Sequence, residues 1–347
     1  MATLDVLSQT IAAIHDETSM LLTKATPFLD RVKSLGKVHS FNGSYQLSIP
    51  VEVDTPGNIT SFSTGYETFD MTLRDSTQRA TFTWGRAGIP ISISGRDKAE
   101  NAGEYQVVDL AETRYKSAMA SLMRALNRQL VVGQSVGNAL ADFGTLNGNT
   151  SAGGSATGFF EAAPAGSQGN SVGGLDKGTY ASVAGWQNQY ATISNDFSAN
   201  GLDALRQVRT ACQLNRASAT DKLFHLVLAS QAGFNNYEAA LYNQQRYVDT
   251  TKLDSGVYSL AYGDAVVVAD PDITLNNVTY TGANAISFYM LNLDGVTLAI
   301  HDEGDFKLTP FIDIPNQDVS TAKIMLMGGL IAKNLGGCGL IVNGETY

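Results

Sequence analysis

The chain is poor in charged residues, in cysteine and in long apolar runs. Charged residues make up 16% of its 347 residues, against roughly 25% in typical soluble proteins. A large surface with so few charges stays soluble in one of two ways: through many Ser, Thr and Asn side chains, or by burial against other copies of the chain. The hydrophobic fraction of 44% is ordinary and provides a sizeable core. The length predicts two domains or one large elongated domain.

Cysteine is nearly absent, with only Cys212 and Cys338, far apart in the chain. A single disulfide between them stays open, but the count is typical of a reducing compartment rather than of a secreted disulfide scaffold. The start of the chain has no basic segment followed by an apolar core, so no signal peptide is indicated. The longest apolar stretch, Ile324–Ala332, is interrupted by two glycines and is too short to cross a bilayer. We therefore expect a protein made in the cytosol that does not insert into a membrane.

Clustered basic residues are also missing, since the net charge is −10 and no run of Lys or Arg occurs. Neutralisation of phosphates by clustered cations provides most of the affinity of proteins for nucleic acids. This composition argues against sequence-specific DNA recognition. It is compatible with a protein that encloses DNA without gripping it.

The first half of the chain predicts extended elements. Apolar residues at spacings of three and four predict a short helix over 3–16. From Tyr45 the period changes to two, which predicts a long two-stranded hairpin with residues 54–78 as its outer part, and the alternation continues through Ile93. An apolar stripe over 103–132 predicts a helix about 45 Å long. A helix of that length indicates an elongated subunit.

The second half predicts an α/β lobe. Residues 133–179 are rich in Gly, Ser, Ala, Asn and Thr, which is typical of a flexible loop or linker. The elements expected after it are helices over 202–214 and 234–247, strands over 223–228, 265–269, 286–291 and 296–300, and long returning strands over 322–342.

Motifs for catalysis or metal binding are few, and each has a simpler structural explanation. Gly133-Gln134-Ser135-Val136-Gly137 matches a hydrolase nucleophile motif, but that chemistry needs a strand, a turn and a helix, and here the motif follows a long helix. A serine acyl hydrolase using Ser135 is therefore only a remote alternative. The cluster at 301–305 (His301, Asp302, Glu303 and Asp305) and Asp270-Pro271-Asp272 favour turns over a Ca²⁺ or Mg²⁺ site.

His225 alternates with Leu223 and Val227, which favours a packed core histidine over a catalyst. We predict no catalytic residue, no cofactor and no metal site, and we do not expect an enzyme.

Several stretches, in a shared order, resemble the HK97-fold major capsid proteins of tailed bacteriophages. The stretches are Gly36-Lys37-Val38 through Asn42-Gly43, Trp84 followed by 89–95, Asn101-Ala102-Gly103, Val172–Tyr180, Trp186–Gln189 and Pro315–Asp318. The resemblance implies an α+β HK97-type capsid fold with an N-arm, an E-loop hairpin, a long spine helix, a P-domain and an A-domain. It divides the chain into 1–43 (N-arm), 44–80 (E-loop), 81–184 with 301–347 (P-domain, spine helix about 103–132) and 185–300 (A-domain).

The resemblance also implies what the protein does. It implies a structural protein that assembles into the hexamers and pentamers of an icosahedral head around double-stranded DNA, with E-loop and N-arm exchanged between subunits. Scaffolding, portal and possibly cement proteins are the expected partners, and the virion capsid is the expected location after assembly in the host cytoplasm. The candidate assembly contacts are Arg74, Arg79, Trp84 and Trp186.

Two departures from the family pattern matter. Some relatives join subunits through an E-loop lysine, but no lysine occurs between Lys37 and Lys98, so that crosslink is excluded here. No long helical segment precedes the arm, so a fused scaffolding region is expected to be absent or removed. An encapsulin-type nanocompartment shell is the closest alternative, and an extracellular adhesin or surface-layer protein is a more distant one.

Overall fold

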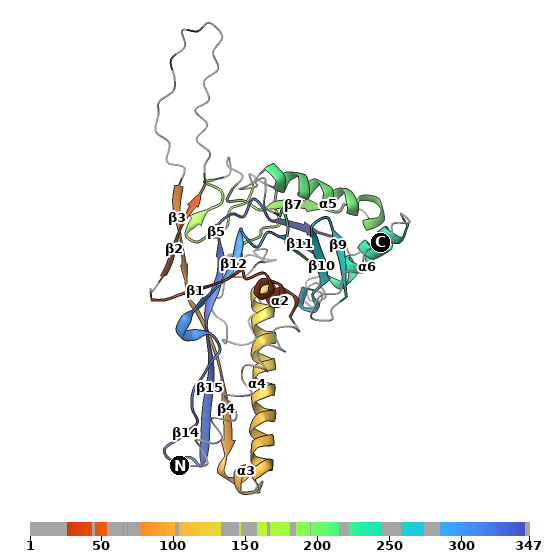
Figure 1. Ribbon diagram of the computed structural model, residues 1–347. Helices are drawn as coiled ribbons and strands as arrows, with labels where there is room; N and C mark the ends of the chain where they lie inside the picture. Colours follow the sequence, from red (N-terminus) through yellow and green to blue (C-terminus); the bar gives the residue numbers. More distant parts are fainter. Residues whose placement is uncertain are drawn as a thin grey trace.

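The chain forms an elongated α+β molecule (Figure 1). The computed structural model describes residues 26–43, 46–53, 65, 68, 77–100, 104–132, 146, 158–164, 167–180, 185–194, 196–214, 222–243, 258–273 and 285–343. The predicted helix over 3–16, most of the outer hairpin and the Ser135 motif lie outside these residues. The predicted fold class is confirmed.

A long helix and two long strands form the lower lobe (Figure 1). Helix α4 spans Glu104–Val132, as its 3.6-residue apolar period predicts. Its apolar stripe is buried, and the buried members are Tyr115, Met119, Leu122, Met123, Leu126 and Leu130. Strand β4 (Gly85–Ser94) runs antiparallel to β15 (Val319–Ala332), with Ile91 opposite Ala322. The sequence alternation places Ala87, Ile91 and Ile93 of β4 in the core, so β4 leaves the hairpin and belongs to this lobe.

Strand β15 organises a six-stranded first sheet. The order is β1–β12–β15–β13, with β14 and β4 also paired to β15. The further bounds are β1 Val38–Phe41, β12 Val296–His301, β13 Lys307–Leu308 and β14 Ile312–Asp313, with a 3₁₀ turn, η1, over Asp302–Gly304. Helix α2 (Pro27–Ser34) precedes β1 and buries Phe28, Leu29 and Val32. The end of the predicted 1–43 arm is therefore part of the body of the subunit.

The upper lobe contains a second sheet of six strands in the order β7–β16–β11–β8–β10–β9. Their bounds are β7 Gln189–Thr192, β16 Gly339–Val342, β11 Ile286–Leu291, β8 Leu226–Ala229, β10 Ala265–Ala269 and β9 Ser259–Tyr262. Successive side chains of a strand point to opposite faces. Val227, Phe288 and Met290 pack in one core with helices α5 (Phe197–Leu214) and α6 (Gln231–Asn243), whereas Leu228 and Tyr289 join the core that contains α4.

Two strands connect the lobes in a way that the linear sequence does not show. Strand β12 pairs with β1 and β15 in the first sheet, and β16 pairs with β7 and β11 in the second. The segment 185–300, predicted to be one domain, therefore contributes β12 to the first sheet. The segment 301–347, predicted to belong to the other domain, contributes β16 to the second sheet. The chain passes between the lobes more than once, which joins them through main-chain connections.

The glycine-rich region 133–179, predicted to be a flexible loop or linker, packs into the body at residues 158–164 and 167–179. Residues 158–164 and 167–180 have defined positions and include the short paired strands β5 (Ser171–Val172) and β6 (Leu175–Asp176). Phe160 is completely buried, and its ring lies 5.7 Å from that of Tyr289 on β11. The described residues are mostly irregular, as expected of a loop, but they are not a linker, because a few large side chains anchor them in the core.

Candidate assembly surfaces

The base of the predicted hairpin is a two-stranded sheet of β2 (Gln46–Glu52) and β3 (Thr77–Thr83). Leu47 is opposite Phe82 and Ile49 is opposite Ala80, as the alternation predicts. These residues face the body, whereas Ser48, Glu52, Thr81 and other polar residues are exposed. An isolated two-stranded hairpin is only marginally stable, so its stability depends on the surface against which it packs.

That surface is the turn between β5 and β6. The Thr81 amide donates a hydrogen bond to the Gly173 carbonyl at 2.8 Å. Gly173 has φ +59°, and a Cβ at this position would lie 2.9 Å from both Ala80 Cβ and Phe82 Cζ. Position 173 therefore requires glycine for two reasons: the left-handed backbone conformation and the close approach of Ala80 and Phe82. Phe82 also packs edge-on against Phe159, with 6.1 Å between the ring centroids.

Of the two predicted arginine contacts, Arg79 is exposed on the outer side of β3, opposite Pro50. Within the described part of the chain it forms no ion pair. Arg74 lies outside the described residues. An unpaired, exposed cation at the base of a hairpin is available to an acidic group of a neighbour, so both contacts stay predictions.

The two tryptophans are in different environments. Trp84 is half-buried where β3 passes into β4, edge-on to His301 at 5.6 Å and tilted to Phe41 at 6.2 Å. Trp186 is completely buried, and its Nε1 donates to the Leu175 carbonyl at 3.4 Å. The Trp186 indole has no surface to offer a neighbour, so any influence on assembly would act through the β5–β6 segment that it supports.

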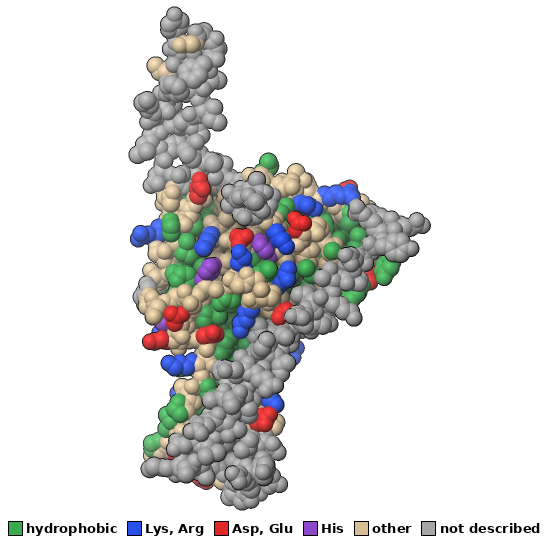
Figure 2. Space-filling view, in the orientation of Figure 1, with side chains coloured by type: hydrophobic (Ala, Val, Ile, Leu, Met, Phe, Trp, Pro, Cys, Tyr) green, Lys and Arg blue, Asp and Glu red, His purple; other side chains and the backbone are tan. Residues whose placement is uncertain are grey.

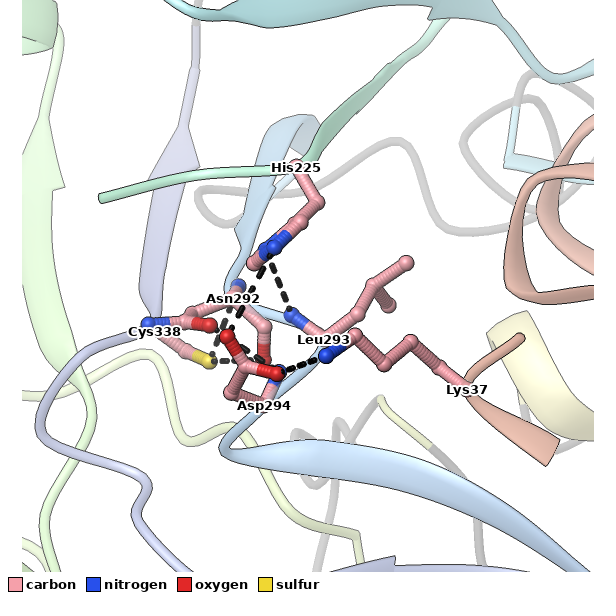
Figure 3. A network of polar contacts seen from close by, with 6 residues as sticks. All are labelled: Lys37, His225, Asn292, Leu293, Asp294 and Cys338. Atoms are coloured by element: carbon pink, nitrogen blue, oxygen red, sulfur yellow. Dashed lines mark hydrogen bonds and ion pairs between the residues drawn. The ribbon is translucent and has the colours of Figure 1, made fainter. Parts of the chain in front are cut away.

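A polar cluster lies where the chain leaves α2 and enters the first sheet (Figure 3). Lys37 forms an ion pair with Asp294 in the turn between β11 and β12. His225 Nδ1 accepts from the Leu293 amide at 3.3 Å, which leaves the proton of the neutral ring on Nε2, 3.6 Å from Asp294 Oδ2. Burial lowers the pKa of His225, and the Asp294 charge opposes this shift. The sequence-based assignment as a core histidine agrees with its burial.

Cys338 lies in the same cluster, where its Sγ accepts from the Asn292 amide at 3.4 Å. Both Cys338 and Cys212 are free and buried. The disulfide that the sequence left open is therefore not formed.

A second buried polar group joins helix α4 to the upper lobe. Asp270 and Asp272, predicted as turn residues, follow β10, and the Asp272 amide donates to Asp270 Oδ1 at 2.9 Å. Asn127 of α4 donates through Nδ2 to Asp272 Oδ2 at 2.7 Å and to Asp270 Oδ2 at 3.3 Å. Burial raises the pKa of Asp270 to about 6. The turn prediction is wrong, because Pro271, Asp272 and Ile273 are helical and both carboxyl groups lie in the core.

Exposed apolar side chains lie on the outer face of the first sheet. Ile312 on β14 is 62% exposed and Met325 on β15 is 44% exposed. Lys323, which lies on β15 between Met325 and the residue opposite Ile312, is also exposed. Figure 2 shows Lys and Arg interspersed with Asp and Glu over the described part of the face it presents. That face offers no continuous cationic field for a nucleic acid.

Within the described ranges, no three His, Cys, Asp or Glu side chains are grouped to hold a metal ion. His301 Nδ1 instead accepts from the Glu303 amide at 3.2 Å in the η1 turn. Among the helices described, none is long and apolar enough to cross a membrane.

The sequence reasoning missed a polar trio in which the half-buried Glu161 accompanies the buried Lys177 and Asn188. The Lys177 side chain is completely buried, and its Nζ donates to the Phe159 carbonyl at 2.6 Å and to Asn188 Oδ1 at 3.2 Å. Lys177 and Asn188 both lie in stretches that resemble the capsid family. Nothing in their local pattern indicates that the amine is buried, because lysine is almost always exposed.

The chain was also compared with known proteins. No family model and no curated protein sequence matches it. Among solved structures, the cyanophage A-1(L) capsid is similar with a TM-score of 0.60 and 15% identity, covering 91% of this chain and 93% of that chain. The capsid of a native GTA particle is similar with a TM-score of 0.53 and 13% identity, covering 90% of each chain.

A structure from Mycobacterium phage Bobi has a TM-score of 0.50 at 10% identity, covering 89% of each chain. At identities this low the likeness establishes the fold alone. The order of the elements in Figure 1, hairpin base, long helix, second sheet and returning β15, agrees with that likeness. The chain therefore has the HK97-type fold of phage capsid proteins.

Proposed function

We propose that this chain is the major capsid protein of a tailed bacteriophage, a structural subunit without catalytic activity. The observation that carries the proposal is the likeness to capsid subunits over about nine tenths of both chains. The motif order along the sequence supports it independently, because it includes stretches from residue 36 to residue 318.

The shape of the subunit suits an assembly in which copies support one another. Strands β2 and β3 pair only with each other in the described part of the chain, so each has one edge without a strand partner. Such edges invite pairing or cover from a neighbouring chain. The exposed Arg79 and the apolar outer face with Ile312 and Met325 offer further contacts.

The domain roles follow from the fold as proposals. Residues 44–80 would lie across the neighbouring subunit as the E-loop. The N-arm, predicted as 1–43, would reach a subunit alongside with the residues that precede α2, because α2 and β1 belong to the body of their own subunit. The A-domain, 185–300, would gather at the centre of hexamers and pentamers. The P-domain, 81–184 with 301–347, would form the surrounding lattice. Scaffolding, portal and possibly cement proteins would act during assembly in the host cytoplasm, and DNA would be enclosed without sequence-specific contacts.

The shell would be held by noncovalent contacts between subunits. Residues 38–97 contain no lysine, so an E-loop lysine cannot join subunits. Burial, hydrogen bonds or a separate cement protein would therefore stabilise the lattice.

Expression of the chain alone, and together with the genes adjacent to its own, tests the proposal. Electron microscopy and sedimentation should reveal closed shells or rings of five and six subunits. A stable monomer in every condition would contradict the proposal. Analysis of the shell contents then separates a phage head from an encapsulin-type compartment, since the first should package DNA and the second a protein cargo.

A further inference from the structure

Lys177 is an unusual lysine, because its amine is buried without a carboxylate partner at ion-pair distance among the described residues. Its side chain is completely buried, and both hydrogen bonds from Nζ go to carbonyl oxygens, those of Phe159 and Asn188. A buried ammonium without a counter-ion is costly, so such an environment favours the neutral amine.

The charge state of this amine is poised near neutral pH. Burial lowers the pKa of Lys177 to about 8, with the Glu161 charge acting in the opposite direction. The neutral amine is therefore more populated at neutral pH than in an exposed lysine. A neutral lysine amine is a nucleophile, whereas the ammonium form is not.

Asn188 presents a carboxamide that is held on both sides. Its Oδ1 accepts from the Glu161 amide at 2.9 Å, and its Nδ2 donates to the Glu161 carbonyl at 3.0 Å and to the Gln189 carbonyl at 3.3 Å. A main-chain donor therefore points at the oxygen that would become negative if Cγ were attacked. Donors fixed in this way stabilise a developing oxyanion.

The chain also holds the two residues side by side. Gln187 Nε2 donates to the Lys177 carbonyl at 2.7 Å, so the segments before and after residues 181–184 are joined next to the reacting groups. Positioning of this kind removes much of the entropic barrier to a bond between two groups.

We propose that Lys177 and Asn188 become joined by an isopeptide bond within the chain. A bond forms between Lys177 Nζ and Asn188 Cγ, and the bond between Cγ and Nδ2 breaks. The lysine ammonium and the carboxamide thus give a secondary amide and an ammonium ion, without any oxidant or reductant. The Glu161 carboxylate, which is anchored by the Gly169 and Asn170 amides, lies beyond ion-pair distance of Nζ but acts on the amine through its charge. An intervening water would carry the amine proton to this carboxylate and back to the departing nitrogen.

The bond would link the end of the β5–β6 segment to the residue that precedes β7. This segment carries Gly173, on which the hairpin base rests. The bond would therefore act as a covalent staple in a chain whose cysteines are free. The proposal does not depend on the shell role of the protein.

Mass spectrometry of the denatured full-length protein tests the bond directly. Loss of one ammonia lowers the intact mass by about 17 Da relative to the sequence. Digestion with trypsin and chymotrypsin should then yield a branched peptide that contains both Lys177 and Asn188 after cleavage at Tyr180. This peptide distinguishes the bond from loss of ammonia at another asparagine.

Matched variants complete the test. Lys177→Arg and Asn188→Ala should restore the full expected mass, whereas Lys222→Arg, at an exposed lysine, should retain the deficit. Glu161→Gln should contain a smaller joined fraction at equal times after synthesis, and a fraction equal to that of the wild type would overturn the proton route. A wild-type protein of full mass that yields only linear peptides would overturn the bond itself, whatever the variants do.

Discussion

The Thr81 amide and the Gly173 carbonyl are joined by a hydrogen bond of 2.8 Å, which attaches the base of hairpin β2–β3 to the turn between β5 and β6. The two residues are far apart in sequence, and the contact is close because Gly173 has no side chain. The direction in which the hairpin leaves the body therefore depends on one glycine in a segment that resembles a linker.

Gly173→Ala should destabilise the subunit and lower the yield of shells. A side chain at φ +59° costs about 2 kcal/mol, and its Cβ would also overlap Ala80 and Phe82. Thermal unfolding and electron microscopy measure the two effects. Gly169→Ala is the control, since a Cβ there meets nothing within 4 Å. Equal stability and equal shell yield for the two variants would show that the turn does not position the hairpin.

Charge reversal at Arg74 and Arg79 together should lower shell yield severalfold while the isolated subunit unfolds at an unchanged temperature. The physical reason is that Arg79 is exposed and forms no ion pair within the described part of its own chain. Sedimentation of assembly mixtures measures the yield. Arg79→Lys, which keeps the charge, should assemble like the wild type, and normal shells from the doubly reversed variant would rule out these contacts.

Protonation of Asp270 should raise the free energy of unfolding as the pH falls from 7 to 4. Its folded-state pKa is raised to about 6 by burial, so the folded state binds a proton more tightly than the unfolded chain. This contribution is fully present below pH 4 and is lost as the pH rises through 6, by at most about 3 kcal/mol. Denaturant unfolding of wild type and Asp270→Asn should show the wild type gaining on the variant as the pH falls from 7 to 4. The exposed Asp264→Asn should track the wild type, and a constant difference for Asp270→Asn would contradict the prediction.

His225 should have the opposite dependence on pH. Burial lowers its pKa below 6.5, so the unfolded chain binds the proton more tightly. Its contribution is present above pH 6.5 and is lost as the pH falls through the folded-state pKa. His225→Asn keeps an acceptor near the Nδ1 position without titrating, so it should lose less stability than the wild type between pH 7 and 5. Identical pH profiles in denaturant unfolding would show that folding does not lower the pKa of His225.

Local patterns predicted many of the elements well. The period of the apolar stripe placed α4 within one residue of its observed start, since a helix that buries one face must repeat every 3.6 residues. Strands β10 and β11 match their predicted bounds, because a short apolar run bounded by turn residues is typical of a buried strand. Alternation also predicted which side of β2 and β3 faces the body.

Long-range packing decided what those patterns left open. Strand β4 pairs with β15, β12 joins the first sheet and β16 joins the second. Each pairing brings together parts of the chain that are distant in sequence, and so does the contact between Phe160 and Tyr289. Composition averages over a segment, whereas burial depends on single anchors such as Phe160. The burial of Lys177 could not be predicted for the same reason. Its amine lies beside Asn188 only because Trp186 and Phe160 hold their segments in the core. The sequence by itself determined the local elements and their buried faces through periodicity. The tertiary structure alone decided which elements meet, because the free energy of burial depends on neighbours that the local sequence does not specify.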